Sequence, residues 1–427
     1  MNDVDHDRLV SLRRGFHRHP EPAWREFWTT ARILAELDRI GVDESLVGPE
    51  VLDADARMGV PDGAELSAWR DRAREAGADP DLLDRLAGGQ TGAIAVLDGE
   101  RDGPTIALRV DIDGLPRVES DDPDHHPAAE GFRSEHPGAM HACGHDAHTT
   151  IGLGVLEALS DRAFAGRLKV LFQPAEEVVG GAAPVAESGH LDDADYLLAL
   201  HIGLDHPTGE VVAGIDGFLA VSHFRAEFAG DPSHAGGHPS EGRNAVQAMA
   251  TAVQNLYAIP RHEDGATRVN AGDVGGGTAA NIVPEQAYIE GEVRGETTDL
   301  MEYMRERADR VLDHAAAMHD CEVEVETAGQ APSAENDPEL VDVVETVAGR
   351  TDGVESVLRH DELGGSEDAT YLMRRVQEYG GKAAFVCVGT DHPGGHHTAT
   401  FDVDEDSLPV GVAVLADTIT HLGREAP

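Results

Sequence analysis

The stretch that decides the fold starts with VSHFRAEFAG at residues 221–230 and continues to residue 329. Its strand-like segments are VSHFRAEFAG, ATRVNAGDVGG (266–276), QAYIEGEVRG (286–295) and CEVEVETAG (321–329). Its helix-like segments are RNAVQAMATAVQNLYAI (243–259) and TDLMEYMRERADRVLDHAAAMH (298–319). The order of these segments is βαββαβ, which is the order of the ferredoxin-like unit. We therefore predict a ferredoxin-like domain from about Ala220 to about Gln330.

An α/β pattern lies on both sides of this unit. The segments before it are strand-like at 91–99, 104–116, 167–177 and 195–203, and helical at 7–20, 26–41 and 151–164. After it follow a helix near 338–349, a strand at 383–389 and a helix that reaches Leu422. Continuous apolar strands that alternate with helices indicate a sheet covered on both faces. We predict one α/β domain built from residues 1–219 and 331–427, with residues 220–330 inserted.

The charge of the chain is strongly negative. Among 427 residues, 80 are acidic and 33 basic, which gives a formal net charge of −47, and Lys169 and Lys382 are the only lysines. Such a surface repels nucleic acid and anionic membranes, so we expect neither as a partner. The acids lie in segments with regular apolar periodicity, so the chain is folded rather than an acidic disordered tail. We expect adaptation to concentrated salt, which screens charge repulsion. An ordinary acidic enzyme is the alternative.

Cysteine content and hydropathy indicate the compartment. The three cysteines, Cys143, Cys321 and Cys387, are odd in number and widely spaced, which argues against a disulfide scaffold and favours a reducing compartment. The first ten residues, MNDVDHDRLV, have no apolar signal core. No segment approaches the roughly 20 apolar residues of a membrane-spanning helix. We expect a soluble, cytoplasmic protein.

The segment MHACGHDAHTT at residues 140–150 is the strongest chemical signal. A cysteine nucleophile with a histidine base is one reading of it. A metal site is the other, since thiolate and imidazole suit Zn²⁺, Mn²⁺ and related ions, and Cys143 and His145 are close enough to approach one centre. A nucleophile does not require the acids and the histidine that end other strands. We therefore favour the metal site.

Polar residues end three of the predicted strands: His201 ends one, and pairs of acids end the other two. Glu176 and Glu177 follow Pro174, where the chain can turn so that one acid holds a metal and the other moves a proton. Asp111 and Asp113 share one face of a strand and could orient histidine ligands, although they could also be ordinary strand-end caps. In a chain with so many acids, a solvated pair is the alternative for the two glutamates.

Eight motifs, in one order, resemble a known family. They are RVDIDGLP (109–116), MHACGHDAHT (140–149), FQPAEE (172–177), LHIG (200–203), SHAGGHPSEGRNAV (233–246), NIVPEQAYIEGEVR (281–294), GGSEDA (364–369) and HHTATFDVDED (396–406). With RRGFHRHPE at 13–21, the resemblance spans nearly the whole chain. It is to the aminoacylase and indoleacetyl-amino-acid hydrolase branch of the dinuclear metallopeptidases. It implies a mixed-sheet α/β catalytic domain with an inserted ferredoxin-like lid and dimerisation domain.

The resemblance also implies roles for individual residues. The implied ligands of two divalent ions, Mn or Zn, are Cys143, His145, Glu177, His201 and His397. Glu176 would be the general base that takes a proton from metal-activated water, and Asp113 an orienting acid. His396 is the alternative to His397 for the ligand role, and the spacing to Phe401 and Asp402 favours His397.

The inserted domain carries the remaining implied roles. His234 would stabilise the oxyanion, in the neighbouring subunit's site of a homodimer, while Asn281 and Arg294 would hold the substrate carboxylate. The implied reaction is amide hydrolysis of a small N-acyl or N-aroyl amino acid, with p-aminobenzoyl-glutamate as one candidate. Because the narrower likeness is to one subunit of a two-subunit enzyme, the alternative is a metal-binding subunit that is active only with a homologous partner chain.

Overall fold

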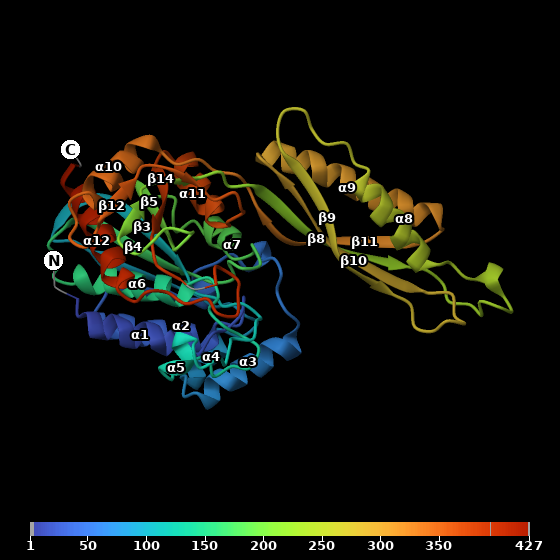
Figure 1. Cartoon of the computed structure of the whole chain (residues 1–427), viewed down its shortest axis with the longest axis horizontal. Helices are drawn as coiled ribbons and strands as arrows, with labels where there is room; N and C mark the ends of the chain where they lie inside the picture. Colours follow the sequence, from blue (N-terminus) through green and yellow to red (C-terminus); the bar gives the residue numbers. More distant parts are fainter. Residues whose placement is uncertain (1–3, 393, 426–427) are drawn as a thin grey trace. The chain divides into compact units, whose positions relative to one another are not determined.

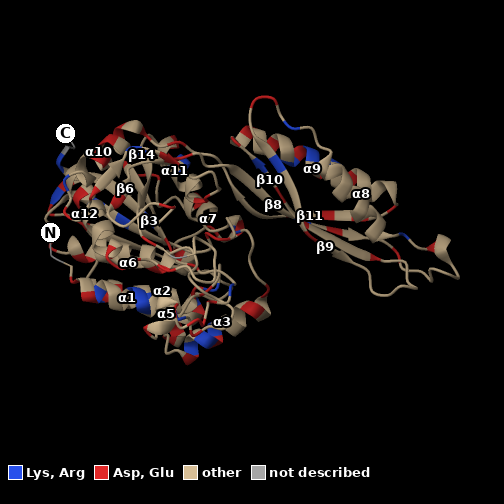
Figure 2. Cartoon of the chain, in the orientation of Figure 1, with Lys and Arg blue, Asp and Glu red and all other residues tan. Residues whose placement is uncertain are grey.

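The computed structural model describes residues 4–392 and 394–425 (Figure 1). The chain forms two compact units. Unit 1 takes its residues from 1–216, 334–363 and 368–427, and unit 2 from 217–333 and 364–367. Acidic residues are spread over the helices and strands of both units (Figure 2). No helix in the described ranges is long and apolar enough to cross a membrane.

A mixed eight-stranded sheet forms the centre of unit 1. Its strands are β1 (Glu44–Val47), β2 (Ala93–Asp98), β3 (Arg101–Asp111), β4 (Ala165–Gln173), β5 (Tyr196–Ile202), β6 (Glu210–Val212), β12 (Ser356–Leu358) and β14 (Lys382–Val388). Their order is β1-β2-β4-β3-β5-β14-β6-β12. β4, β3, β5 and β14 run parallel in the middle, and β1–β2, β2–β4 and β14–β6 pair antiparallel. A separate parallel pair joins β7 (Ile215–Asp216) to β13 (Asp361–Glu362).

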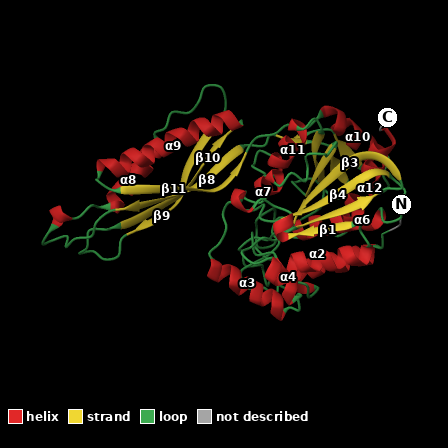
Figure 3. Cartoon of the chain, turned by 180° about the vertical axis from the view of Figure 1, so that it is seen from behind, coloured by secondary structure: helices red, strands yellow, loops and turns green. Residues whose placement is uncertain are grey.

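Helices cover this sheet (Figure 3). The helices of unit 1 are α1 (His6–Arg18), α2 (Phe27–Ile40), α3 (Gly63–Glu75), α4 (Pro80–Arg85), α5 (His126–Ala129), α6 (His145–Ala158), α7 (Ala182–Glu187), α10 (Pro338–Ala348), α11 (Ala369–Glu378) and α12 (Ser407–Glu425). Apolar residues of α1, α2, α6, α10 and α12 form the larger core with β3, where Ile106, Leu108 and Val110 are fully buried. Helix α11 packs on β5 and β14. The predicted α/β layer structure is confirmed.

Helix α6 differs from its predicted range of 151–164. It starts at His145, because Gly144 lies in the left-handed region with φ +87°, and ends at Ala158, shortly before Arg162 at φ +61°. The residues of the first turn, HDAH, are polar, so they show no apolar periodicity although they are buried. The short strands β1, β6 and β12 were not predicted, because segments of three or four residues are too short to show a period.

Unit 2 has the predicted βαββαβ order. Its elements are β8 (Ala220–Ala229), α8 (Ala245–Tyr257), β9 (Thr267–Gly276), β10 (Gln286–Gly295), α9 (Thr298–Met318) and β11 (Glu322–Ala331). The antiparallel sheet has the order β11-β8-β10-β9. Residues of α8 and α9 such as Ala248, Leu256, Met304 and Leu312 pack on the inner face of the sheet. The opposite face carries the charged side chains of β8, β10 and β11.

Candidate metal centre

Cys143 and His145 flank a glycine that the local geometry requires. Gly144 has φ +87°, and a Cβ there would lie 2.5 Å from Cγ2 of Ile202. Any L side chain would therefore be both strained and in collision with β5. The tight turn brings the Cys143 thiol, the His145 ring and His201 at the end of β5 into one group, whose donor atoms lie within 4.8 Å of one another.

The hydrogen bonds of the histidines decide which nitrogens are available. His201 Nδ1 lies 2.8 Å from the Ile202 carbonyl oxygen and donates to it, so Nε2 keeps its lone pair, 3.6 Å from Sγ of Cys143. His148 uses both nitrogens: Nδ1 lies 2.5 Å from the Asp111 carboxylate, and Nε2 accepts the Ile202 amide at 2.8 Å. His148 therefore orients the site and offers no donor atom to a cation.

The two glutamates stand on a turn that other buried acids hold. Ala175 has φ +56°, and its amide donates to Glu26 at 2.8 Å. The Asp113 carboxylate accepts the amides of Glu176 and Glu177 at 3.0 and 3.1 Å. Asp113 thus fixes the backbone from which both carboxylates project, a role that the sequence did not indicate. One of its oxygens also lies 3.5 Å from Nδ1 of His145.

The His145 ring lies at the middle of the cluster. Its Nε2 is 3.9 Å from a Glu176 oxygen and 3.8 Å from a Glu177 oxygen. The ring is 1% exposed, and neither of its nitrogens has a hydrogen-bond partner among the described residues. A buried imidazole that is surrounded by carboxylates and a thiol, yet bonded to none of them, fits a cation between these groups.

The C-terminal segment adds His397. Its Nε2 lies 3.5 Å from a Glu177 oxygen, and its amide donates to the Ala142 carbonyl at 2.7 Å. With φ +61°, His397 has an uncommon backbone conformation for a residue with a side chain. His396 instead points its Nε2 at the Ile202 carbonyl, 3.3 Å away. Of the two candidates, His397 is the one that joins Cys143 and Glu177.

The electrostatics of the cluster favour positive charge. Burial disfavours a charged imidazole, yet the Asp111 and Asp113 carboxylates raise the pKa of His145 well above its usual value. Burial and then Glu177 raise the pKa of the Cys143 thiol well above its usual value. Burial and the neighbouring His148 hold the pKa of His201 well below normal. A thiolate, carboxylates and a neutral imidazole are the donor set of Zn²⁺, Mn²⁺ and similar ions, and the residues fit such a site.

The predicted residues of unit 2 fall at two separate places. His234 and Asn281 lie on neighbouring segments. The amide of Ala235 donates to the Asn281 carbonyl at 3.0 Å, and the amide of Val283 donates to the Ser233 carbonyl at 2.9 Å. The exposed His234 accepts the amides of Gly236 and Gly237 at Nδ1, which leaves the proton on Nε2. Arg294 lies near the other end of β10. The strand between Gln286 and Arg294 covers about 27 Å at about 3.4 Å per residue.

Arg294 is held in place from two sides. Its Nε and one terminal nitrogen donate to the Glu292 carboxylate at 3.0 and 2.9 Å, and the other terminal nitrogen donates to Ser366 at 3.1 Å. A guanidinium has five N–H groups, so two remain for a ligand. Bonds from His223 and Arg294 hold the pKa of Glu292 at about 2, so this carboxylate stays ionised beside Arg294.

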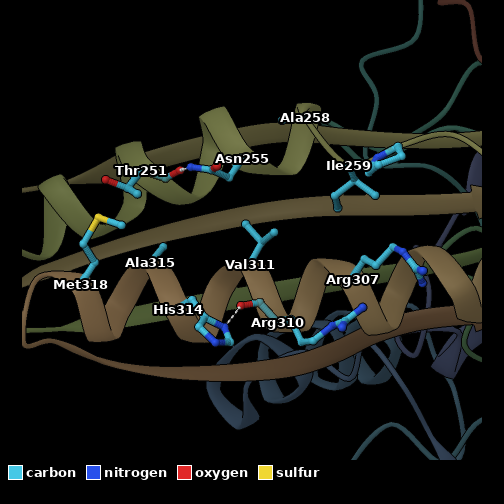
Figure 4. A pocket seen from close by; sticks show the side chains of 11 residues that line it. Thr251, Asn255, Ala258, Ile259, Arg307, Arg310, Val311, His314, Ala315 and Met318 are labelled. Atoms are coloured by element: carbon cyan, nitrogen blue, oxygen red, sulfur yellow. Dashed lines mark hydrogen bonds between the residues drawn. The ribbon is translucent and has the colours of Figure 1, made fainter.

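A groove of about 480 Å³ between α8 and α9 is a different kind of site (Figure 4). Arg307, Arg310 and His314 line it together with apolar residues such as Val311 and Met318. Among the described residues that line it there is no carboxylate and no thiol, so it lacks the donor set of the metal centre.

Sequence reasoning missed the buried charges behind the cluster. Arg13, His17 and Glu26 are all 0% exposed, and each bonds to a segment that carries a candidate ligand or base. Arg13 and His17 occupy positions in the apolar stripe of α1, beside Leu12 and Phe16. Charged residues at such positions are the signal that could have identified them.

Comparisons with known proteins identify the family. The model of Peptidase family M20/M25/M40 matches residues 107–421. The chain is 45% identical to indole-3-acetyl-aspartic acid hydrolase of Enterobacter agglomerans, covering 96% of this chain and 94% of that protein. It is 41% identical to one subunit of the p-aminobenzoyl-glutamate hydrolase of Escherichia coli K12, with 96% and 95% covered.

Solved structures show the same likeness. An aminobenzoyl-glutamate utilization protein from Klebsiella pneumoniae superimposes with a TM-score of 0.83 at 38% identity, covering 97% of this chain and 95% of that one. A dinuclear metal binding peptidase of the M20 family from Bacillus subtilis gives 0.68 at 26% identity, with 98% of each chain covered. This protein is therefore a member of Peptidase family M20/M25/M40, and an enzyme that hydrolyses amide bonds.

Proposed function

We propose that this enzyme cleaves the amide bond between an acyl or aroyl group and an amino acid, with an acidic amino acid preferred. The observation that carries the proposal is the cluster of Cys143, His145, Glu177, His201 and His397 with Glu176 beside it. Two relatives that are more than 40% identical are named for amides of aspartate and glutamate. Arg294, with two N–H groups left to donate, suits a substrate carboxylate.

Five residues would hold two divalent ions, Mn²⁺ or Zn²⁺: Cys143, His145, Glu177, His201 and His397. Such ions, when bound, make water more acidic and polarise the amide carbonyl. Glu176 is the residue that moves the proton. It takes a proton from the attacking water and delivers it to the leaving amine nitrogen, while Asp113 holds the Glu176 backbone in place.

Unit 2 would act as lid and dimerisation domain. His234 donates from Nε2 to the oxyanion, and Asn281 and Arg294 bind the substrate carboxylate. Because about 27 Å of β10 separates the two places, His234 and Asn281 of one chain belong to a different active site from its Arg294. In a homodimer in which each chain supplies His234 and Asn281 to the active site of the other chain, one site can contain these two residues together with Arg294.

The edge strand β9 supports such a dimer. It is ten residues long, and Val274 is 45% exposed. The other edge, β11, carries Glu322, Glu324 and Glu326 at alternate positions, which disfavours pairing with a second copy. We propose that two copies meet along β9.

Mixing two inactive variants tests the exchange. In a mixed dimer of Glu176→Gln and His234→Ala, one site would combine an intact Glu176 with an intact His234 from the other chain. We expect up to a quarter of wild-type activity after the two variants are unfolded and refolded together, because half of the dimers are mixed and each has one complete site. Activity that stays at the level of the separate variants would show that His234 serves its own chain.

The substrate test uses purified chain in molar KCl with Mn²⁺ or Zn²⁺. p-Aminobenzoyl-glutamate, indole-3-acetyl-aspartate and N-acetyl amino acids are compared by kcat/KM. We expect the acidic aroyl or arylacetyl amides to be cleaved best. Equal rates on neutral N-acetyl amino acids would remove the acidic preference, and the metal giving the higher rate at equal occupancy would identify the cofactor.

A second candidate is a subunit that requires a homologous partner chain. The word "subunit" in the name of one relative favours it. Activity of the chain purified alone would exclude this candidate. We also propose a cytoplasmic location and adaptation to high salt, from the charge of −47 and the three unpaired cysteines. Unfolding in dilute buffer that is reversed by molar KCl would support the salt dependence.

A further inference from the structure

The motif RRGFHRHPE at the start of the chain has no role in the chemistry above. Its first arginine, Arg13, and His17 lie one turn apart on α1 and are both 0% exposed. A fully buried arginine is costly unless its charge is compensated, so its partners indicate what it does.

Arg13 bonds to two segments that are far apart in the sequence. Its Nε donates to Asp146 at 2.8 Å, and a terminal nitrogen donates to Asp402 at 2.6 Å. Asp146 directly follows His145 in the chain, and Asp402 lies five residues after His397. One planar guanidinium therefore links two segments that carry candidate ligands and are far apart in the sequence.

His17 completes the arrangement. Its Nδ1 lies 2.8 Å from the same Asp146 oxygen, and its Nε2 lies 3.0 Å from Glu119. Burial and Arg13 oppose a charged ring, yet Asp146 and Glu119 raise the pKa of His17 to about 9. The side chains of Arg13 and His17 thus both hold Asp146, while His126 binds the second oxygen of Asp402 at 2.8 Å.

We propose that Arg13 is a positioning residue that sets the spacing between segments 143–146 and 397–402, and with it the affinity for the second metal ion. The inference rests on the proposed ligands. The bond from the His397 amide to the Ala142 carbonyl joins the two segments beside the proposed ligands. Arg13 adds a link between Asp146 and Asp402, through buried side-chain bonds in fixed directions.

The test variant is Arg13→Lys. Lysine keeps the charge but has no planar fork, so it cannot bind Asp146 and Asp402 in fixed directions at once. Groups that orient metal ligands typically change metal affinity by about 10–100-fold when removed. We expect the Kd of the weaker Mn²⁺ site, measured by competition with a chromophoric chelator in molar KCl, to rise by about that factor.

Arg8→Gln is the matched control. Arg8 stands on the same helix and also bonds to two acids, Glu36 and Glu157, but neither adjoins a ligand segment. The metal affinity of Arg8→Gln should equal that of the wild type. This should hold even if the Tm of metal-free Arg8→Gln falls as far as that of Arg13→Lys. Unchanged affinity in folded Arg13→Lys, or an equal loss in Arg8→Gln, overturns the proposal.

If Arg13→Lys does not fold, Asp402→Asn removes one side of the same arrangement and should weaken the same site. Unchanged Mn²⁺ affinity in that variant overturns the proposal as well. A wild-type chain that binds fewer than two ions would overturn the ligand assignment itself. Two ions in the wild type with normal affinity in Arg13→Lys would overturn the role of Arg13 alone.

Discussion

The two units of the molecule use charge in opposite ways. In unit 1, Arg13 and Arg109 are 0% exposed and bond to buried aspartates. In unit 2, Arg225 and Glu290 pair on the open face of the sheet, 37% and 50% exposed. His145 is buried, whereas His234 stands on an exposed loop. The charged groups around His145 in unit 1 are thus held by buried partners, while His234 of unit 2 is open to solvent.

The largest effect should come from the buried unit. Glu176→Gln removes the proton acceptor, and we expect kcat to fall by about 10²–10⁴-fold. Metal content, measured by mass spectrometry, should stay the same, because Glu177 and not Glu176 is the proposed ligand. A variant with normal kcat would show that another group moves the proton. The proposed catalytic role of unit 1 would then no longer rest on Glu176.

The next effect belongs to the loop of unit 2. His234→Ala should lower kcat by about 10²–10³-fold, as expected for one lost oxyanion donor. His238→Ala, in the same exposed loop, is the control and should keep normal kcat. An equal loss in both variants would indicate that loop structure rather than the His234 donor matters.

Arg294→Lys should act on KM. Hydrogen bonds to charged groups contribute about 1.5–3 kcal/mol, so losing the fork should raise KM by about 10-fold or more, with a smaller change in kcat. Arg225→Lys, on the same face of the sheet and also paired with glutamates, should leave KM unchanged. A large fall in kcat with constant KM would move Arg294 from substrate binding to the reaction itself.

Salt should have the smallest effect, and it tests the charge of the whole surface. A substrate with two carboxylates is repelled by a chain of charge −47, and salt shortens the range of that repulsion. Between 0.5 and 2 M KCl we expect KM to fall severalfold for the glutamate amide and less for an amide of a neutral amino acid. An identical salt response for both substrates would place the effect on folding instead.

The sequence predicted what depends on periodicity and on local motifs. The βαββαβ order of unit 2 and the strands that end at Asp111, Gln173 and Ile202 follow from apolar runs and their breaks. The clustering of Cys143, His145 and Glu177 also followed from motifs.

What remained hidden depends on contacts between distant segments. The place of Arg13 in the apolar stripe of α1 indicates burial, but no local pattern indicates its partner Asp402, nor the bonds of Asp113 to the glutamate amides. The separation of Arg294 from Asn281 follows from the length of the strand between them, but the resemblance, which gives both residues one role, does not indicate it.

The position of β14 has a consequence for biosynthesis. It lies between β5 and β6 in the sheet, so the centre of unit 1 cannot close until residues 382–388 have been made. At the usual rate of about 5–20 residues per second, the ribosome needs roughly 10–40 s to proceed from Ile202 to Val388. The main part of unit 2, residues 217–333, is continuous in sequence and can fold during that delay. The nascent chain can therefore carry a folded sheet and helices of unit 2 while the sheet of unit 1 still lacks β14.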